Sequence, residues 1–199
     1  MNPVARLRDA AVQAVCIGAS AGGVEALLSL LPGLPAHYSL PVVVVLHLPD
    51  ARDSALAEVF QHRLALKVRE AGDKEPVAGG TVYFAPPGYH LLVEREHCFS
   101  LSCDPPLNHS RPAIDLLFES AAHAWGAGAA ALLLTGANDD GAKGLAAVAR
   151  AGGVTAVQSP ATARVATMPE AALRLDPSHA SLDLPDLQKL LIELDRRHA

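Results

Sequence analysis

Three side chains that together can carry out nucleophilic acyl transfer follow three separate apolar runs of this 199-residue chain. Ser20 lies in GASAGG after the first run, His47 follows VVVVL, and Asp140 lies in ANDDG after ALLLTG. A hydroxyl nucleophile, an imidazole base and a carboxylate that orients the imidazole are the groups that serine hydrolases use. If the apolar runs are parallel strands, their carboxyl ends share one edge of a sheet, so we expect the three side chains to converge there.

Each of the three residues also has a simpler structural interpretation. Ser20 precedes a predicted helix and would be a good N-cap, and Asp140 could cap the helix that follows it. His47, taken alone at the end of a valine-rich run, is more often structural than catalytic. The combination favours chemistry, because unrelated structural residues need not supply a nucleophile, a base and an orienting acid together.

The glycine-rich segment around Ser20 allows two further interpretations. G-x-S-x-G is the nucleophile elbow of α/β-hydrolases, but their order of residues differs, and His179 or His198 would have to be the base. A glycine-rich turn before a helix is also an anion site, although the spacing matches neither the dinucleotide-binding fingerprint nor the P-loop. In the acyl-transfer interpretation, backbone amides at the helix start would stabilise an oxyanion. The candidates for this role are Ala21, Gly22 and Gly23.

Apolar runs alternate with helical patterns along the chain, which predicts βαβ units around a parallel sheet. Residues 79–102 carry three strand-like segments with no room for a helix, so we expect an antiparallel meander attached to that sheet. The predicted strands are 12–17, 41–46, 128–134 and 153–158. The predicted helices are 23–31, 54–64, 114–125, 142–150 and an amphipathic terminal helix with Pro185 in its first turn.

Composition excludes several classes of protein. The net charge is −5 and no Lys/Arg cluster is present, so we expect no nucleic-acid binding. No apolar run approaches the roughly 18 residues of a membrane span, so no membrane insertion is expected. Three cysteines without CxxC spacing indicate neither a disulfide framework nor a zinc site, so we expect no bound metal and a reducing, cytoplasmic setting.

Several separated motifs of the chain resemble the catalytic domain of the CheB family of chemotaxis protein-glutamate methylesterases. They extend from about Val15 to the terminal helix and read IGASAGG, HLP, VYFAPPGYHLLV, NHSRPAIDLLFESAA, LLTGANDDGAKGL and QSPATARVATMPEAA. The resemblance implies an α/β fold with a doubly wound, mostly parallel sheet and an antiparallel hairpin at one end. It also implies that Ser20 is the nucleophile, His47 the base and Asp140 the residue that orients the imidazole.

The resemblance further implies a substrate and a partner. Family members hydrolyse γ-glutamyl methyl esters on cytoplasmic chemoreceptor helices to glutamate and methanol, and some also deamidate receptor glutamines. We therefore expect a cytoplasmic enzyme that needs no cofactor and acts on the methylated cytoplasmic region of a chemoreceptor or related signalling protein. Only residues 1–11 precede the first predicted strand, so we expect residues 1–199 to form one catalytic domain without the family's usual receiver domain.

Two departures from the family pattern keep a second function open. The family usually has Thr where this chain has Ala21, and Met-Gly-Asn-Asp-Gly where this chain has residues 137–141. Asp139 adds a carboxylate that could raise the pKa of a neighbouring acid or replace Asp140 as the partner of the imidazole. The alternative function is a catalytically weakened signalling module that binds a partner helix through the same cleft. His90, after the APPGY turn, is expected at the rim of that cleft.

Overall fold

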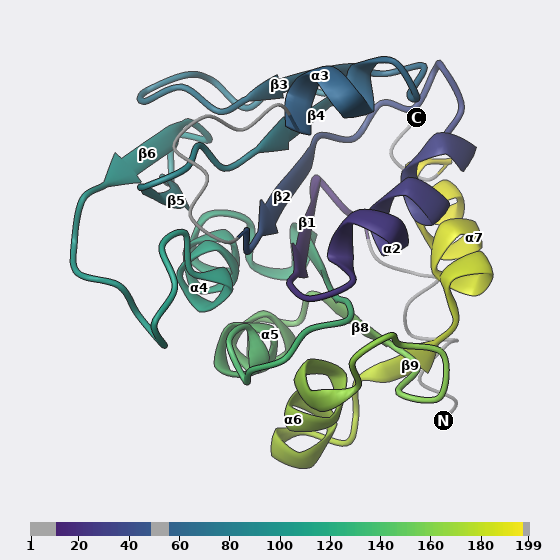
Figure 1. Ribbon diagram of the computed structural model, residues 1–199. Coiled ribbons are helices and arrows are strands. Elements are labelled where there is room, and N and C mark those ends of the chain that lie inside the picture. The colour runs from purple at the N-terminus through teal and green to yellow at the C-terminus, as the bar shows by residue number, and fades with distance from the viewer. Residues whose placement is uncertain (1–10, 49–55, 197–199) are drawn as a thin grey trace.

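The computed structural model describes residues 11–48 and 56–196, and its centre is a seven-stranded sheet with helices on both faces (Figure 1). The strand order is β3-β4-β2-β1-β7-β8-β9, and every neighbouring pair is parallel. A separate antiparallel sheet pairs β5 with β6. The strands are β1 (Ala14–Ala19), β2 (Val42–Leu46), β3 (Lys67–Glu70), β4 (Thr81–Phe84), β5 (His90–Val93), β6 (Phe99–Ser102), β7 (Ala129–Leu133), β8 (Val154–Gln158) and β9 (Ala180–Leu182).

The helices fall into groups by the face of the sheet that they cover (Figure 1). α2 packs on α7 on one face, and α4 packs on α5, with α6 beside α5, on the other face. Asp195, at the end of α7, accepts hydrogen bonds from the N–H and the hydroxyl of Ser39, each 2.7 Å long. The helices are α2 (Gly23–Leu30), α3 (Leu56–Gln61), α4 (Ile114–Trp125), α5 (Ala142–Arg150), α6 (Thr167–Leu175) and α7 (Leu184–Asp195).

Alternation along the central strands builds an apolar core on each face of the sheet. In β1, Val15 and Ile17 belong to the core under α2 and α7, whereas Ala14 and Cys16 belong to the core under α4 and α5. β2 alternates in the same way, which is why its run of valines is completely buried. Burial raises the pKa of the Cys16 thiol to about 12, so Cys16 is an inert core residue.

The predicted fold class is confirmed, and the predicted helices 114–125 and 142–150 have the observed bounds. The predicted meander is wrong in its first segment, because β4 is a fully buried parallel strand between β3 and β2. Only β5 and β6 form the hairpin. β3, β9 and α6 were not predicted. The predicted helix start at Ser54 lies outside the described residues, and within them no helix has the length and apolar character to cross a membrane.

His179 makes the stability of the fold depend on pH. It is buried just before β9, where its Nδ1 lies 2.9 Å from Oγ1 of Thr155. Burial lowers the pKa of His179 below its ordinary value of 6.5, and the Asp176 carboxylate opposes this effect only in part. The unfolded chain therefore binds a proton that the folded chain rejects, and the free energy of unfolding should fall as the pH drops below 6.5.

Urea unfolding from about pH 7.5 to about pH 5 measures this contribution. His179→Gln should remove the part of the fall in unfolding free energy that His179 causes. His62→Gln, which replaces an exposed histidine, should leave this fall unchanged. An unchanged decline in His179→Gln would show that another group is responsible.

Candidate active site at the carboxyl ends of the central strands

The three predicted chemical groups follow three adjacent strands. β2, β1 and β7 are neighbours in the sheet, and they are followed by His47, by Ser20 and by the loop that carries Asp140. α2 leaves β1 toward one face of the sheet, and α5 leaves β7 toward the other (Figure 1). The order in which strands are added to the sheet therefore reverses between β1 and β7, and open α/β sheets bind ligands in the crevice at such a point.

Backbone hydrogen bonds hold Ser20 next to the strands on both sides. The register pairs Ala19 with Leu46, so Ser20 and His47 are the next residues on adjacent strands. The His47 N–H donates to the Ala19 carbonyl at 3.0 Å, and the Ser20 N–H donates to the Thr135 carbonyl at 2.9 Å. In the part of the chain that the structure describes, the Ser20 hydroxyl makes no hydrogen bond.

Ser20 opens a tight turn into α2. The Gly23 N–H donates to the Ser20 carbonyl at 2.7 Å, and Gly22 has φ 80° and ψ 4°, values typical of the third position of a type II turn. A Cβ on Gly22 would lie 2.8 Å from the Cβ of Arg164, so glycine is required here by both backbone and space. Ser20 is not the N-cap of α2, because Gly22 is. Since Gly23 uses its N–H inside the turn, the oxyanion candidates that remain are the amides of Ala21 and Gly22.

Thr135, just after β7, fastens this turn to two other loops. Its Oγ1 donates to the Ala21 carbonyl at 2.8 Å and accepts from the Val165 N–H at 2.9 Å. Gln158, at the end of β8, accepts the Thr135 N–H at 3.0 Å. The hydroxyl and the backbone N–H of Thr135 therefore hold together the loops after β1, β7 and β8.

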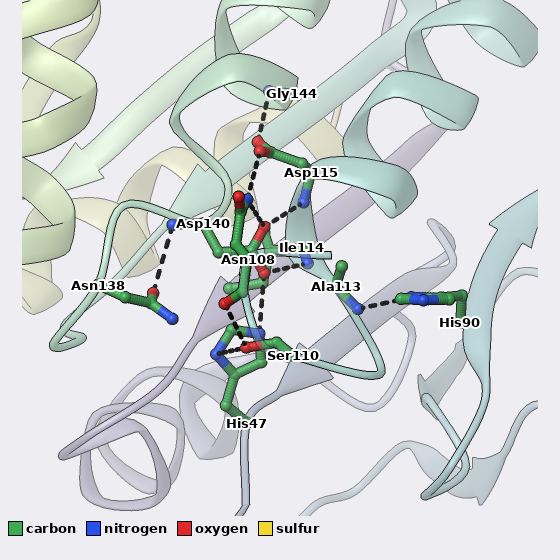
Figure 2. Close-up of polar contacts among 10 residues, drawn as sticks. All are labelled: His47, His90, Asn108, Ser110, Ala113, Ile114, Asp115, Asn138, Asp140 and Gly144. Atoms are coloured by element: carbon green, nitrogen blue, oxygen red, sulfur yellow. Dashed lines mark hydrogen bonds and ion pairs between the residues drawn. The ribbon is translucent and has the colours of Figure 1, made fainter. Parts of the chain in front are cut away.

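His47 and Asp140 are in direct contact (Figure 2), with His47 Nε2 2.9 Å from Asp140 Oδ2. The Asp140 side chain is completely buried, and that of His47 is 12% exposed. The carboxylate also accepts the backbone N–H of Ile114 at 2.7 Å and of Asp115 at 3.1 Å, the first two residues of α4. Asp140 therefore caps α4 and not the following helix α5, whose N-cap is Gly141.

The pKa of Asp140 is lowered although the group is buried. Burial by itself would raise this pKa, but the contact with His47 and the N–H groups of Ile114 and Asp115 outweigh it. The positive end of the α4 dipole adds to this stabilisation of the charge. Beside an ionised Asp140, the neutral tautomer of His47 with its proton on Nε2 is favoured, and in that tautomer Nδ1 is an acceptor.

A second buried carboxylate lies next to the first (Figure 2). Asp115 Oδ1 accepts the Gly144 N–H at 2.8 Å, and Asn108 Nδ2 donates to both Asp115 Oδ2 at 3.1 Å and Asp140 Oδ1 at 3.3 Å. Burial raises the pKa of Asp115, the Gly144 N–H opposes this, and the charge of Asp140 raises it further. Neither Asp115 nor Asn108 was singled out from the sequence, where only the motif NHSRPAIDLLFESAA contained a signal for them.

Several other residues considered from the sequence lie away from this contact. Asp139 is exposed, and the carboxylate that contacts His47 belongs to the residue after it. His90 is completely buried and accepts a backbone N–H at the start of α4 (Figure 2), so its predicted place at the cleft rim is wrong. Of the alternative bases, His179 is buried beside β8, and His198 lies outside the described residues.

A cavity of about 730 Å³ opens beside His47, a volume typical of ligand sites. His109, Ser110 and Arg111 give it a polar wall, and Phe84 contributes to an apolar one. Across the described ranges, no group of three His, Cys, Asp or Glu side chains is placed to hold a metal ion.

Replacing Asp140 with Asn should destabilise the fold by about 3 kcal/mol, because an amide offers one acceptor oxygen and places an NH₂ group against hydrogen-bond donors. Urea unfolding at neutral pH measures this loss. Asp139→Asn is the matched control, since it removes the same charge from an exposed neighbour and should change stability by less than about 0.5 kcal/mol. Equal stabilities for Asp140→Asn and the wild type would contradict the hydrogen bonding described above.

The chain is similar to known proteins over nearly its whole length. A family model described as CheB methylesterase matches residues 15–191. A Leptospira interrogans protein, named as a candidate protein-glutamate methylesterase/protein-glutamine glutaminase, is 39% identical over 94% of this chain and 96% of its own length. A protein-glutamate methylesterase/protein-glutamine glutaminase of Hahella chejuensis is 41% identical over 93% of this chain, which spans 51% of that protein. The crystal structure of the Thermotoga maritima CheB methylesterase catalytic domain matches with a TM-score of 0.86 and 33% identity, over 92% of this chain and 98% of that one. The chain therefore belongs to the CheB methylesterase family.

Proposed function

We propose that this protein is a serine esterase that hydrolyses glutamate γ-methyl esters of signalling proteins, with Ser20 as nucleophile, His47 as base and Asp140 as the orienting acid. The observation that carries the proposal is the contact between His47 Nε2 and the buried Asp140 carboxylate, at the end of the strand next to the one that Ser20 follows. The relatives from Leptospira and Hahella, which are named as protein-glutamate methylesterases, supply the substrate class.

The first half of the reaction forms an acyl-enzyme. The Ser20 hydroxyl attacks the ester carbonyl while His47 Nδ1 takes the hydroxyl proton. Negative charge develops on the carbonyl oxygen, and the amides of Ala21 and Gly22 at the start of α2 are the groups proposed to stabilise it. When the tetrahedral intermediate collapses, the proton on Nδ1 passes to the leaving oxygen and methanol departs.

The second half releases glutamate. A water molecule attacks the acyl-enzyme, His47 takes one of its protons, and that proton returns to Ser20 as the acyl bond breaks. A glutamine side chain would follow the same path with ammonia in place of methanol, which is the glutaminase activity in the relatives' names. The proposed partner is the methylated cytoplasmic region of a chemoreceptor or a related signalling protein, so the reaction would take place in the cytoplasm.

Methanol release from a methyl-esterified chemoreceptor tests the proposal. Ser20→Ala should lower the rate by at least about a thousandfold, because the covalent route is lost. Ser29→Ala, which changes an exposed serine in the body of α2, is the control and should leave the rate unchanged. Ammonia release from the unmethylated receptor measures deamidation in the same preparations.

Each remaining outcome has a definite meaning. Equal release by Ser20→Ala and the wild type would show that another group is the nucleophile. If the folded wild type releases no methanol but binds the receptor as tightly as Ser20→Ala does, the protein is a binding module that uses the same cleft.

A further inference from the structure

The nitrogen of His47 that should act as base faces a hydroxyl other than that of Ser20. Ser110 Oγ lies 3.4 Å from His47 Nδ1 (Figure 2) and 3.5 Å from the carbonyl oxygen of Asn108. We propose that Ser110 is a positioning residue whose hydroxyl adapts to the protonation state of His47 and stabilises the imidazolium formed when Ser20 is activated. This inference rests on the proposed function, in which His47 is the base.

A tight turn fixes Ser110 in this position. The Leu107 N–H donates to the Ser110 carbonyl at 3.1 Å, and the Ser110 N–H donates to the Leu107 carbonyl at 2.9 Å. The two residues between them have φ values of 49° and 62°, as in a type I′ turn. Asn108 in this turn donates to the Asp140 carboxylate. The turn that carries Ser110 is therefore tied to the same carboxylate that holds the opposite nitrogen of His47.

A hydroxyl can serve both protonation states of the imidazole, because it is a donor and an acceptor. While His47 is neutral, with its proton on Nε2 against Asp140, the Ser110 O–H donates to Nδ1. When Nδ1 takes the proton of Ser20, the Ser110 O–H turns to the Asn108 carbonyl, and its oxygen accepts from Nδ1–H. Only a hydroxyl hydrogen rotates, Ser110 keeps its own proton, and the proton on Nδ1 is later passed to the leaving group.

Ser110 has one effect that favours the reaction and one that opposes it. In the neutral state it competes with Ser20 for Nδ1, but that hydrogen bond is long and joins two uncharged groups. Hydrogen bonds to an ionised partner are roughly twice as strong as those between neutral groups. Stabilisation of the imidazolium therefore outweighs the competition, and Ser110 accelerates the reaction of Ser20.

The rate at which a fluorophosphonate labels Ser20 tests the inference without any receptor. Ser110→Ala should lower the labelling rate constant about tenfold, because a hydrogen bond to the developing charge is lost. It should also move the acidic limb of the rate–pH profile to lower pH, since the protonated imidazole loses more stabilisation than the neutral one. Ser110→Thr keeps the hydroxyl and should stay close to the wild type in both measurements.

Among the residues that the structure describes, the other ionisable groups near His47 are Asp140 on the opposite nitrogen and His109 and Arg111, which line the same cavity. They stay the same in both variants. Thermal unfolding of each variant confirms that the fold is retained, and peptide mapping identifies the labelled serine.

Three results would overturn the inference: an unchanged rate and profile in Ser110→Ala, an equal loss in Ser110→Thr, or a label on Ser110 itself. Labelling does not depend on the natural substrate. Normal labelling of Ser20 without methanol release would therefore refute the proposed methylesterase and still decide the role of Ser110. Failure of the folded wild type to label at Ser20 would refute both.

Discussion

A buried negative charge at Asp140 controls the geometry of the candidate site. A carboxylate moved out of water loses several kcal/mol of hydration unless donors replace the water. Here the replacement comes from the first two N–H groups of α4, the amide of Asn108 and the imidazole of His47. Because these donors belong to separate segments of the chain, satisfying the charge fixes the start of α4 and the end of β2 relative to the loop after β7.

The close approach of α4 that this charge requires explains two glycines. A Cβ on Gly18, in β1, would lie 2.3 Å from Cγ2 of Ile114, and a Cβ on Gly141 would lie 2.7 Å from the same atom. Gly141 also has φ 94°, which favours glycine independently. The glycine of IGAS thus serves the packing of α4 on the sheet, whereas the next glycine along, Gly22, serves the turn that begins at Ser20.

The parts of the fold that could be predicted from the sequence are those that leave a local pattern of apolar residues. The central strands are buried on both faces, so they appear as apolar runs, and the residues that follow these runs could be predicted to be neighbours from the sequence alone. β3 has no such run, because its residues alternate between exposed and half-buried at the edge of the sheet. Asn108 and Ser110 lie in an irregular segment, and their contacts with the site depend on how that segment folds back over the strand ends. No local pattern encodes such a contact.

The position of α7 has a consequence for the order in which the two faces of the sheet can mature during synthesis. Leucines of α7 complete the core on the α2 face, and Asp195 bonds Ser39, which is 156 positions earlier in the chain. α2 leaves the ribosome soon after β1, but the part of this core that α7 covers stays open until the last helix has been made. α4 and α5, which cover the opposite face, are both complete before α7. A nascent chain of this protein passes through a stage in which one side of its sheet is packed and the other still exposes apolar surface, the kind of surface that chaperones bind.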